Sequence, residues 1–182
     1  ESRKVNVREN KYNPANLFKG IISQTDSKLK NNVIEFRTKY DETIPKELYG
    51  DSIRIRQIIN TLIDNAIKYT DEGFIELNVN SIIKHDICRL IVTVEDSGRG
   101  MKQEIVEHIL DKNINKIDKI DDAKMDLGLV KTLLDLIGGT IVVNSDNGKE
   151  YDYPETPSVF AENVYDGKAG LQLDLLDRVV LG

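Results

Sequence analysis

Cysteine is almost absent from this sequence: Cys88 is the single one in 182 residues. One thiol excludes an intrachain disulfide and a cysteine metal cluster, and its apolar surroundings predict a small buried side chain. No apolar run approaches the roughly 20 residues of a membrane-spanning helix, and no signal peptide opens the chain. The formal net charge of -6 disfavours nucleic acid as a partner, because a polyanion would be repelled.

What is present indicates an ordinary globular domain, with 40% hydrophobic and 31% charged residues. The length suits one well-cored domain, or a domain with a tail. The periodic pattern weakens beyond Gly148, where prolines and glycines interrupt it. We therefore expect a domain over residues 1–149, followed by a tail or linker over 150–182 that could add an edge strand. Alternating leucines between residues 171 and 176 fit a strand or a helix, and periodicity does not choose between them.

Hydrophobic periodicity and capping residues predict alternating helices and strands. Asn13-Pro14 and Asp51 are suited to begin two long helices, and Gly138-Gly139 is suited to end a third. The expected helices span about residues 13–30, 51–69, 102–110 and 127–137, and the expected strands span about 5–7, 34–40, 74–79, 89–94 and 140–143. The strands over 74–79 and 89–94 should form an antiparallel hairpin.

The helix over 51–69 has one apolar side and one polar side. A polar side normally meets water, and that reading suffices for most of its residues. Asn65 and Lys68, however, place an amide oxygen and an ammonium group one turn apart. The amide could bind Mg²⁺, which prefers oxygen ligands, and the lysine could meet phosphate. Tyr69 could pack its ring against an apolar base.

A second motif follows the predicted hairpin. Asp96 ends an apolar strand, and Gly98 and Gly100 follow it, with Met101 closing the run. The carboxylate could accept a hydrogen bond from an exocyclic amine, while the glycines would let the backbone approach a ligand. Taken alone, a plain turn explains this pattern equally well.

The two motifs together resemble a known family. Residues 65–70, Asn-Ala-Ile-Lys-Tyr-Thr, are similar to the N box of sensor histidine kinases, and Asp96 to Met101 resembles the first glycine box. Residues 133–145 resemble the segment after the second glycine box, so that the resemblance covers about residues 5–149. It implies a two-layer α/β sandwich, with a mixed, mostly antiparallel sheet covered on one face by three helices.

The resemblance also implies a function, namely presenting Mg²⁺-ATP for phosphoryl transfer to a histidine on a separate dimerisation domain. It implies that Asn65 binds the metal. The residues that it implies in nucleotide binding are Asn65, Lys68, Tyr69, Asp96, Gly98, Gly100, Met101 and Gly128. The expected partners are the upstream histidine-containing domain and a response regulator receiver domain, in a homodimeric parent protein. The chain begins with Glu1, as an excised cytoplasmic fragment of a membrane-anchored parent could.

Several positions depart from the family pattern. Lys124 and Asp126 stand where two glycines close a lid over the phosphates, and only Gly128 can be aligned to one by a deletion. The phenylalanine of the lid and the last glycine box are also missing. These departures support an alternative, a degenerate kinase-like domain that acts as a signalling or interaction module. Related gyrase and chaperone ATPases have a glutamate where this chain has Thr61, which cannot act as a base, so hydrolysis is disfavoured. Neither His85 nor His108 resembles a phosphoacceptor, and both are expected at the surface.

Overall fold

The computed structural model describes residues 8–84, 87–98, 122–144 and 170–179. Its helices are α1 (Pro14–Leu29), α2 (Ser52–Tyr69) and α4 (Asp122–Ile137). Its strands are β1 (Asn10–Tyr12), β2 (Ile34–Tyr40), β3 (Leu48–Gly50), β4 (Gly73–Lys84), β5 (Ile87–Asp96), β6 (Thr140–Asn144) and β7 (Gly170–Val179).

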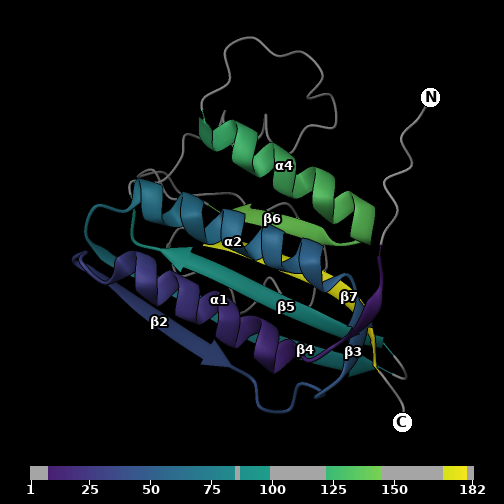
Figure 1. The fold of residues 1–182 in the computed structure, drawn as a ribbon. Helices are drawn as coiled ribbons and strands as arrows, with labels where there is room; N and C mark the ends of the chain where they lie inside the picture. The colour runs from purple at the N-terminus through teal and green to yellow at the C-terminus, as the bar shows by residue number, and fades with distance from the viewer. Residues whose placement is uncertain (1–7, 85–86, 99–121, 145–169, 180–182) are drawn as a thin grey trace.

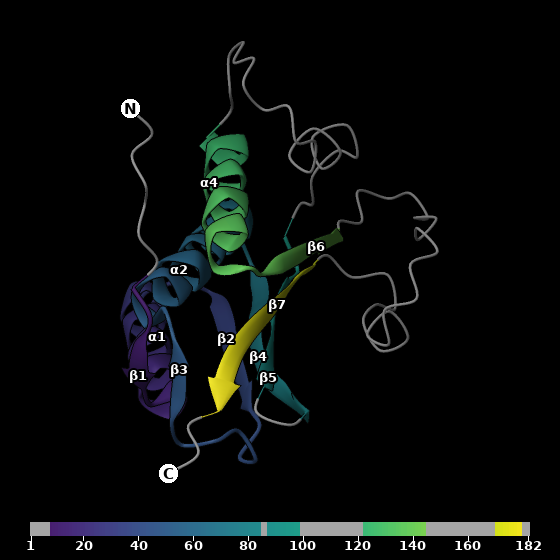
Figure 2. The same ribbon diagram turned by 90° about the vertical axis from the view of Figure 1, so that its right-hand side faces the viewer.

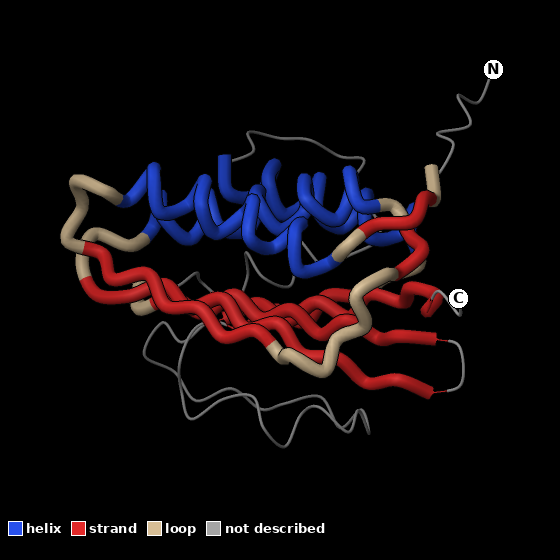
Figure 3. The backbone as a smooth tube through the Cα atoms, turned by 60° about the horizontal axis from the view of Figure 1, so that its bottom comes forward, coloured by secondary structure: helices blue, strands red, loops and turns tan. Residues whose placement is uncertain are grey.

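One sheet contains all seven of these strands, in the order β1-β3-β7-β5-β4-β2, with β6 pairing with β7 beside this path. The β2–β4 pair is parallel, and the other described pairs are antiparallel. The three described helices lie on one face of the sheet, as Figures 1 and 3 show. The predicted two-layer α/β sandwich with a mixed, mostly antiparallel sheet is therefore confirmed.

The strand nearest the end of the sequence lies inside the sheet. β7 pairs with β5 along its length, and on its other side with β6 and β3. The leucine pattern between residues 171 and 176 thus belongs to a strand, but the expected edge position was wrong, since β7 has neighbours on both sides (Figure 2). The predicted boundary at residue 150 falls outside the described residues, as do the strand at 5–7 and the helix at 102–110.

The helix ends follow local capping chemistry. Asn13 Oδ1 accepts a hydrogen bond from the backbone N–H of Asn16 at 3.1 Å, and Asp51 Oδ1 accepts one from that of Arg54 at 3.1 Å. α4 ends at Ile137, and the next residue, Gly138, has a φ of 75° that reverses the chain into β6. Its start differs from the expectation, because α4 begins at Asp122 rather than near residue 127. The polar composition of this first turn and a half concealed its helical state.

The core lies between the helices and the sheet. The apolar side predicted for α2 is buried except for Ile67, which is half-buried, and the second strand of the hairpin buries Cys88 as expected. The fully buried large side chains are Phe18, Ile21, Leu48, Ile55, Ile58, Ile59, Leu62, Ile63, Ile75, Leu77 and Leu90. α2 supplies five of these eleven side chains. Because its apolar side is held in the core, the rotation of the helix about its own axis is fixed, and this rotation determines which of its polar residues can face a ligand.

Candidate nucleotide site

Two chain segments that are distant in sequence meet at one end of the molecule. α2 ends at Tyr69 and β5 ends at Asp96, and the hydroxyl of Thr70 donates to Asp96 Oδ1 at 3.4 Å. In Figure 1 both elements point toward the same end, and α4, which packs against α2, begins there as well. The described residues of the two motifs are thus brought to the same end of the fold.

Asn65 lies on the polar side predicted for α2, yet only 6% of it is exposed. Its side-chain oxygen Oδ1 is buried and has no hydrogen-bond partner among the residues that the structure describes. An unpaired buried acceptor costs about 1–3 kcal/mol, and a bound ligand is one way to offset that cost. An amide oxygen is a ligand type that Mg²⁺ accepts, and the orphaned Oδ1 therefore fits the predicted metal site.

Lys68 and Tyr69 end the helix one turn after Asn65. Lys68 is exposed, and its ammonium nitrogen lies 5.6 Å from the centroid of the Tyr69 ring, within the range of a cation–π contact. Tyr69 is half-buried. The arrangement presents a positive charge and an aromatic wall together, which suits a phosphate and a base.

Asp96 is a partly buried carboxylate. Burial raises its pKa above the ordinary value, while hydrogen bonds from the Gly98 backbone N–H and the Thr70 hydroxyl act in the opposite direction. The Gly98 N–H donates to Oδ1 at 2.8 Å. The described residues supply no hydrogen bond to the second oxygen, Oδ2. A desolvated acceptor of this kind is suited to an exocyclic amino group.

Gly98 is required by close packing. A Cβ atom at this position would lie 2.6 Å from the backbone oxygen of Tyr69, 2.6 Å from Asp96 Oδ1 and 2.8 Å from Thr70 Oγ1. Real Cβ atoms do not approach so closely, and a backbone carbonyl has little freedom to move away. The glycine predicted from the motif thus lies against both other parts of the site.

Sequence reasoning missed Thr70 and Ser97. The Ser97 Oγ accepts a hydrogen bond from the Phe74 N–H at 2.9 Å, and the Ser97 N–H donates to the Phe74 oxygen at 3.0 Å. Gly73, with a φ of 112°, leaves room for this contact, since a Cβ there would lie 2.0 Å from Ser97 Oγ. These bonds tie the segment after β5 to the start of β4. A small hydroxyl residue within each motif was the available signal.

The remaining predicted site residues are placed as follows. Gly128 lies inside α4, where a Cβ would meet nothing within 4 Å. Gly100 and Met101 lie outside the described residues, as do His85 and His108. Roles for these positions stay predictions.

Thr61 and Asp64 lie on the polar side of α2. The Thr61 hydroxyl donates to the backbone oxygen of Gln57 at 2.7 Å, and the Asp64 carboxylate pairs with Lys28 of α1 at 2.5 Å. Both groups are engaged within the helical layer. That hydrolysis is disfavoured for want of a base at Thr61 stays a prediction.

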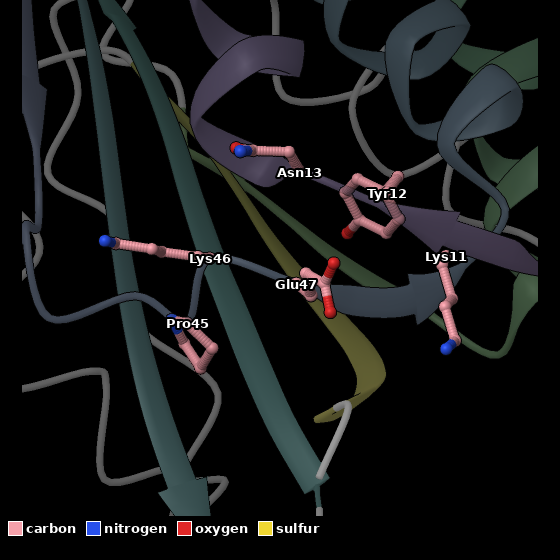
Figure 4. Close-up of a pocket in the computed structure, with 6 residues that line it drawn as sticks. All are labelled: Lys11, Tyr12, Asn13, Pro45, Lys46 and Glu47. Carbon is pink, nitrogen blue, oxygen red and sulfur yellow. The ribbon is translucent and has the colours of Figure 1, made fainter. Parts of the chain in front are cut away.

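A hollow of about 560 Å³ lies elsewhere, at the junction of β1 and α1 (Figure 4). It is lined by Lys11, Tyr12, Asn13, Pro45, Lys46 and Glu47. Asn13 is already engaged as the α1 cap, and the lining contains none of the predicted site residues. Within the described part of the chain, three or more histidine, cysteine or acidic side chains do not gather in a metal cluster.

The sequence profile of the "Histidine kinase-, DNA gyrase B-, and HSP90-like ATPase" family matches residues 50–154, more than half of the chain. This chain belongs to that family. Within it, the chain is an ATP-binding catalytic domain of the sensor histidine kinase type, as the motifs predicted.

The relatives of this histidine kinase domain are much longer proteins. The sensor protein TorS of Escherichia coli is 28% identical over 143 residues, which are 79% of this chain and 15% of TorS. The autoinducer 2 sensor kinase/phosphatase LuxQ of Vibrio parahaemolyticus is 26% identical over 147 residues, 78% of this chain and 16% of LuxQ. The chain thus spans about a sixth of the length of these relatives.

Solved structures share the fold of the histidine kinase domain. The catalytic domain of histidine kinase ThkA superposes with a TM-score of 0.64 at 17% identity, covering 93% of this chain and 97% of that one. Full-length ShkA in complex with AMPPNP gives a TM-score of 0.68 at 18% identity, covering 98% of this chain and 33% of ShkA.

None of the described helices is long and apolar enough to cross a bilayer.

Proposed function

We propose that this domain binds Mg²⁺-ATP and presents it for phosphoryl transfer to a histidine on a separate dimerisation domain. The observation that carries the proposal is the buried Oδ1 of Asn65, which has no partner within the described ranges and lies at the same end of the fold as the Asp96 carboxylate. In this proposal Asn65 holds the metal, Lys68 meets the phosphates, and Asp96 and Tyr69 hold the adenine.

The roles follow from charge and geometry. Phosphoryl transfer needs positioning and charge neutralisation more than covalent chemistry from the protein. A bound Mg²⁺ would offset phosphate charge beside the amide oxygen of Asn65. The ammonium group of Lys68 adds a second positive charge, and the Asp96 carboxylate accepts from the adenine amino group. Residues Gly98, Gly100, Met101 and Gly128 complete the proposed binding set.

The proposal extends to the parent protein. We propose a homodimeric sensor kinase with an upstream histidine-containing domain and a response regulator receiver domain as partners. The parent would be membrane-anchored, with this domain on the cytoplasmic side.

A binding experiment tests the nucleotide proposal. Calorimetric titration of the chain with ATP, with and without Mg²⁺, should show binding that the metal strengthens. Asn65→Ala should remove the strengthening by the metal. Asn60→Ala is the matched control, because Asn60 is an amide on the same helix that bonds Gln24 of α1 at 3.4 Å. Equal affinity of the Asn65→Ala and wild-type chains for Mg²⁺-ATP would refute the assigned role.

The helical start of α4 favours one second candidate, a nucleotide-sensing module without turnover. Lys124 and Asp126, which stand in place of lid glycines, lie within this helix rather than in a glycine loop. Incubation with radiolabelled ATP and a histidine-containing dimerisation domain separates the two functions. Labelled histidine supports the kinase, whereas ATP binding without any label supports the module.

A further inference from the structure

Thr70 is the first residue after α2, and it turns the chain sharply out of the helix. Its backbone is extended, with φ of -113° and ψ of 112°, and only 3% of the residue is exposed. A β-branched side chain has few rotamers in such a position, so the direction of its hydroxyl is restricted. Among the described residues, the acceptor of this hydroxyl is Asp96 Oδ1, at 3.4 Å.

Three groups converge on the same point. The Gly98 N–H donates to Asp96 Oδ1 at 2.8 Å, on the same oxygen that the Thr70 hydroxyl approaches. A Cβ added to Gly98 would lie within 2.8 Å of both the hydroxyl and the carboxylate oxygen, which shows how little space separates them. Two donors on Oδ1 restrain the rotation of the carboxylate. They leave Oδ2 for a ligand.

We propose that Thr70 is a positioning residue that orients Asp96 toward the amino group of adenine and so strengthens the preference for ATP over 6-oxopurine nucleotides. This inference rests on the proposed function, in which Asp96 binds the base. Without the hydroxyl, one backbone hydrogen bond holds the carboxylate, and the carboxylate can rotate about that bond. Oδ2 of Asp96 then points toward the adenine amino group for a smaller fraction of the time.

The electrostatics of Asp96 make this role measurable. Burial is the largest influence on the pKa of Asp96, followed by the opposing hydrogen bonds from Gly98 and Thr70, and no charged side chain of the described residues contributes. A hydrogen bond to the ionised form lowers the pKa of a carboxyl group. Removing the Thr70 hydroxyl should therefore raise the pKa of Asp96 further.

The test compares Thr70→Val, which keeps the shape but cannot donate, with Thr70→Ser, which keeps the donor. Calorimetry gives the affinities for Mg²⁺-ATP and Mg²⁺-inosine triphosphate, which has an oxygen where adenine has its amino group. Carboxyl-carbon NMR titration follows Asp96 in the same proteins. We expect Thr70→Val to lower the ATP preference about 3- to 10-fold, the effect of one hydrogen bond, and to raise the pKa. Thr70→Ser should behave as the wild type does.

The outcomes separate this role from the proposed function. If the wild-type chain binds no ATP, both are refuted. If it binds ATP, but Thr70→Val keeps the wild-type preference, only the role of Thr70 is refuted. An equal loss in Thr70→Ser and Thr70→Val would likewise exclude the hydroxyl as the cause. Should the valine variant fail to fold, Thr70→Ala takes its place in each comparison.

Discussion

Replacing Asp96 by asparagine should separate ligand binding from stability. The asparagine oxygen can still accept from Gly98 and Thr70, which donate to Oδ1 at 2.8 and 3.4 Å. The amide nitrogen then takes the place of Oδ2 and presents a donor to the adenine amino group. A hydrogen bond to a charged group contributes about 1.5–3 kcal/mol, so ATP affinity should fall about 10- to 150-fold.

The Asp96→Asn variant should bind ATP less tightly, but its thermal stability at pH 7 should not fall. Burial raises the pKa of Asp96, so the folded state favours the protonated form. Below the pKa that Asp96 has in the unfolded chain, its carboxyl group does not reduce stability. Stability is lost as pH rises through the pKa that Asp96 has in the folded chain. At pH 7 a neutral asparagine avoids this loss. We therefore expect Asp96→Asn to melt at or above the wild-type temperature at pH 7, with the difference vanishing in acid.

Asp41→Asn is a matched control, because the pKa of Asp41 is shifted in the opposite direction to that of Asp96. Hydrogen bonds from the Thr43 hydroxyl and backbone N–H lower the pKa of Asp41, so its ionised form favours the folded state. Its contribution is present above the unfolded pKa and is lost as pH falls through the folded pKa. Asp41→Asn should thus melt slightly lower at pH 7 and bind ATP normally. Wild-type ATP affinity in Asp96→Asn, or melting well below the wild type at pH 7, would refute the reasoning.

Four further substitutions follow from the packing. Gly98→Ala should weaken ATP binding at least about tenfold in calorimetry, because its methyl group meets a backbone oxygen at 2.6 Å. Gly128→Ala should instead raise stability by about 0.5–1 kcal/mol in urea unfolding, since its methyl group meets nothing inside α4. Ser97→Ala should speed hydrogen exchange at the Phe74 amide, which loses its 2.9 Å acceptor; unchanged exchange would contradict the assigned contact. Ile59→Ala should cost about 2–5 kcal/mol in the same urea experiment, because Ile59 is fully buried.

Local patterns were sufficient to predict the three described helices and the strands β2, β4, β5 and β6, whereas β1 and β3 were not predicted. The apolar side of α2 follows from its helical period, and the caps Asn13 and Asp51 were predicted because capping depends on near neighbours. The interior position of β7 could not be predicted, since a strand pattern specifies faces and not neighbours.

The candidate site was predicted only in part, because a sequence pattern does not show which distant segments come into contact. Motif spacing pointed to Asn65 and Asp96, but the burial of Asn65 depends on contacts across the fold that helical period does not show. Thr70 and Ser97 were missed because their partners come from segments 26 and 23 residues away in sequence. A hydroxyl gives no sign of such a partner until the hairpin brings the segments together.

The interior place of β7 has a consequence for biogenesis. β5 offers nine consecutive residues to β7, from Ile87 to Glu95, and β3 and β6 also depend on it. A nascent chain that has not yet delivered residues 170–179 would leave this long edge open to pairing with other molecules. Completion of the sheet must therefore await synthesis of residues 170–179, and a shortened product ending before β7 should be prone to aggregation.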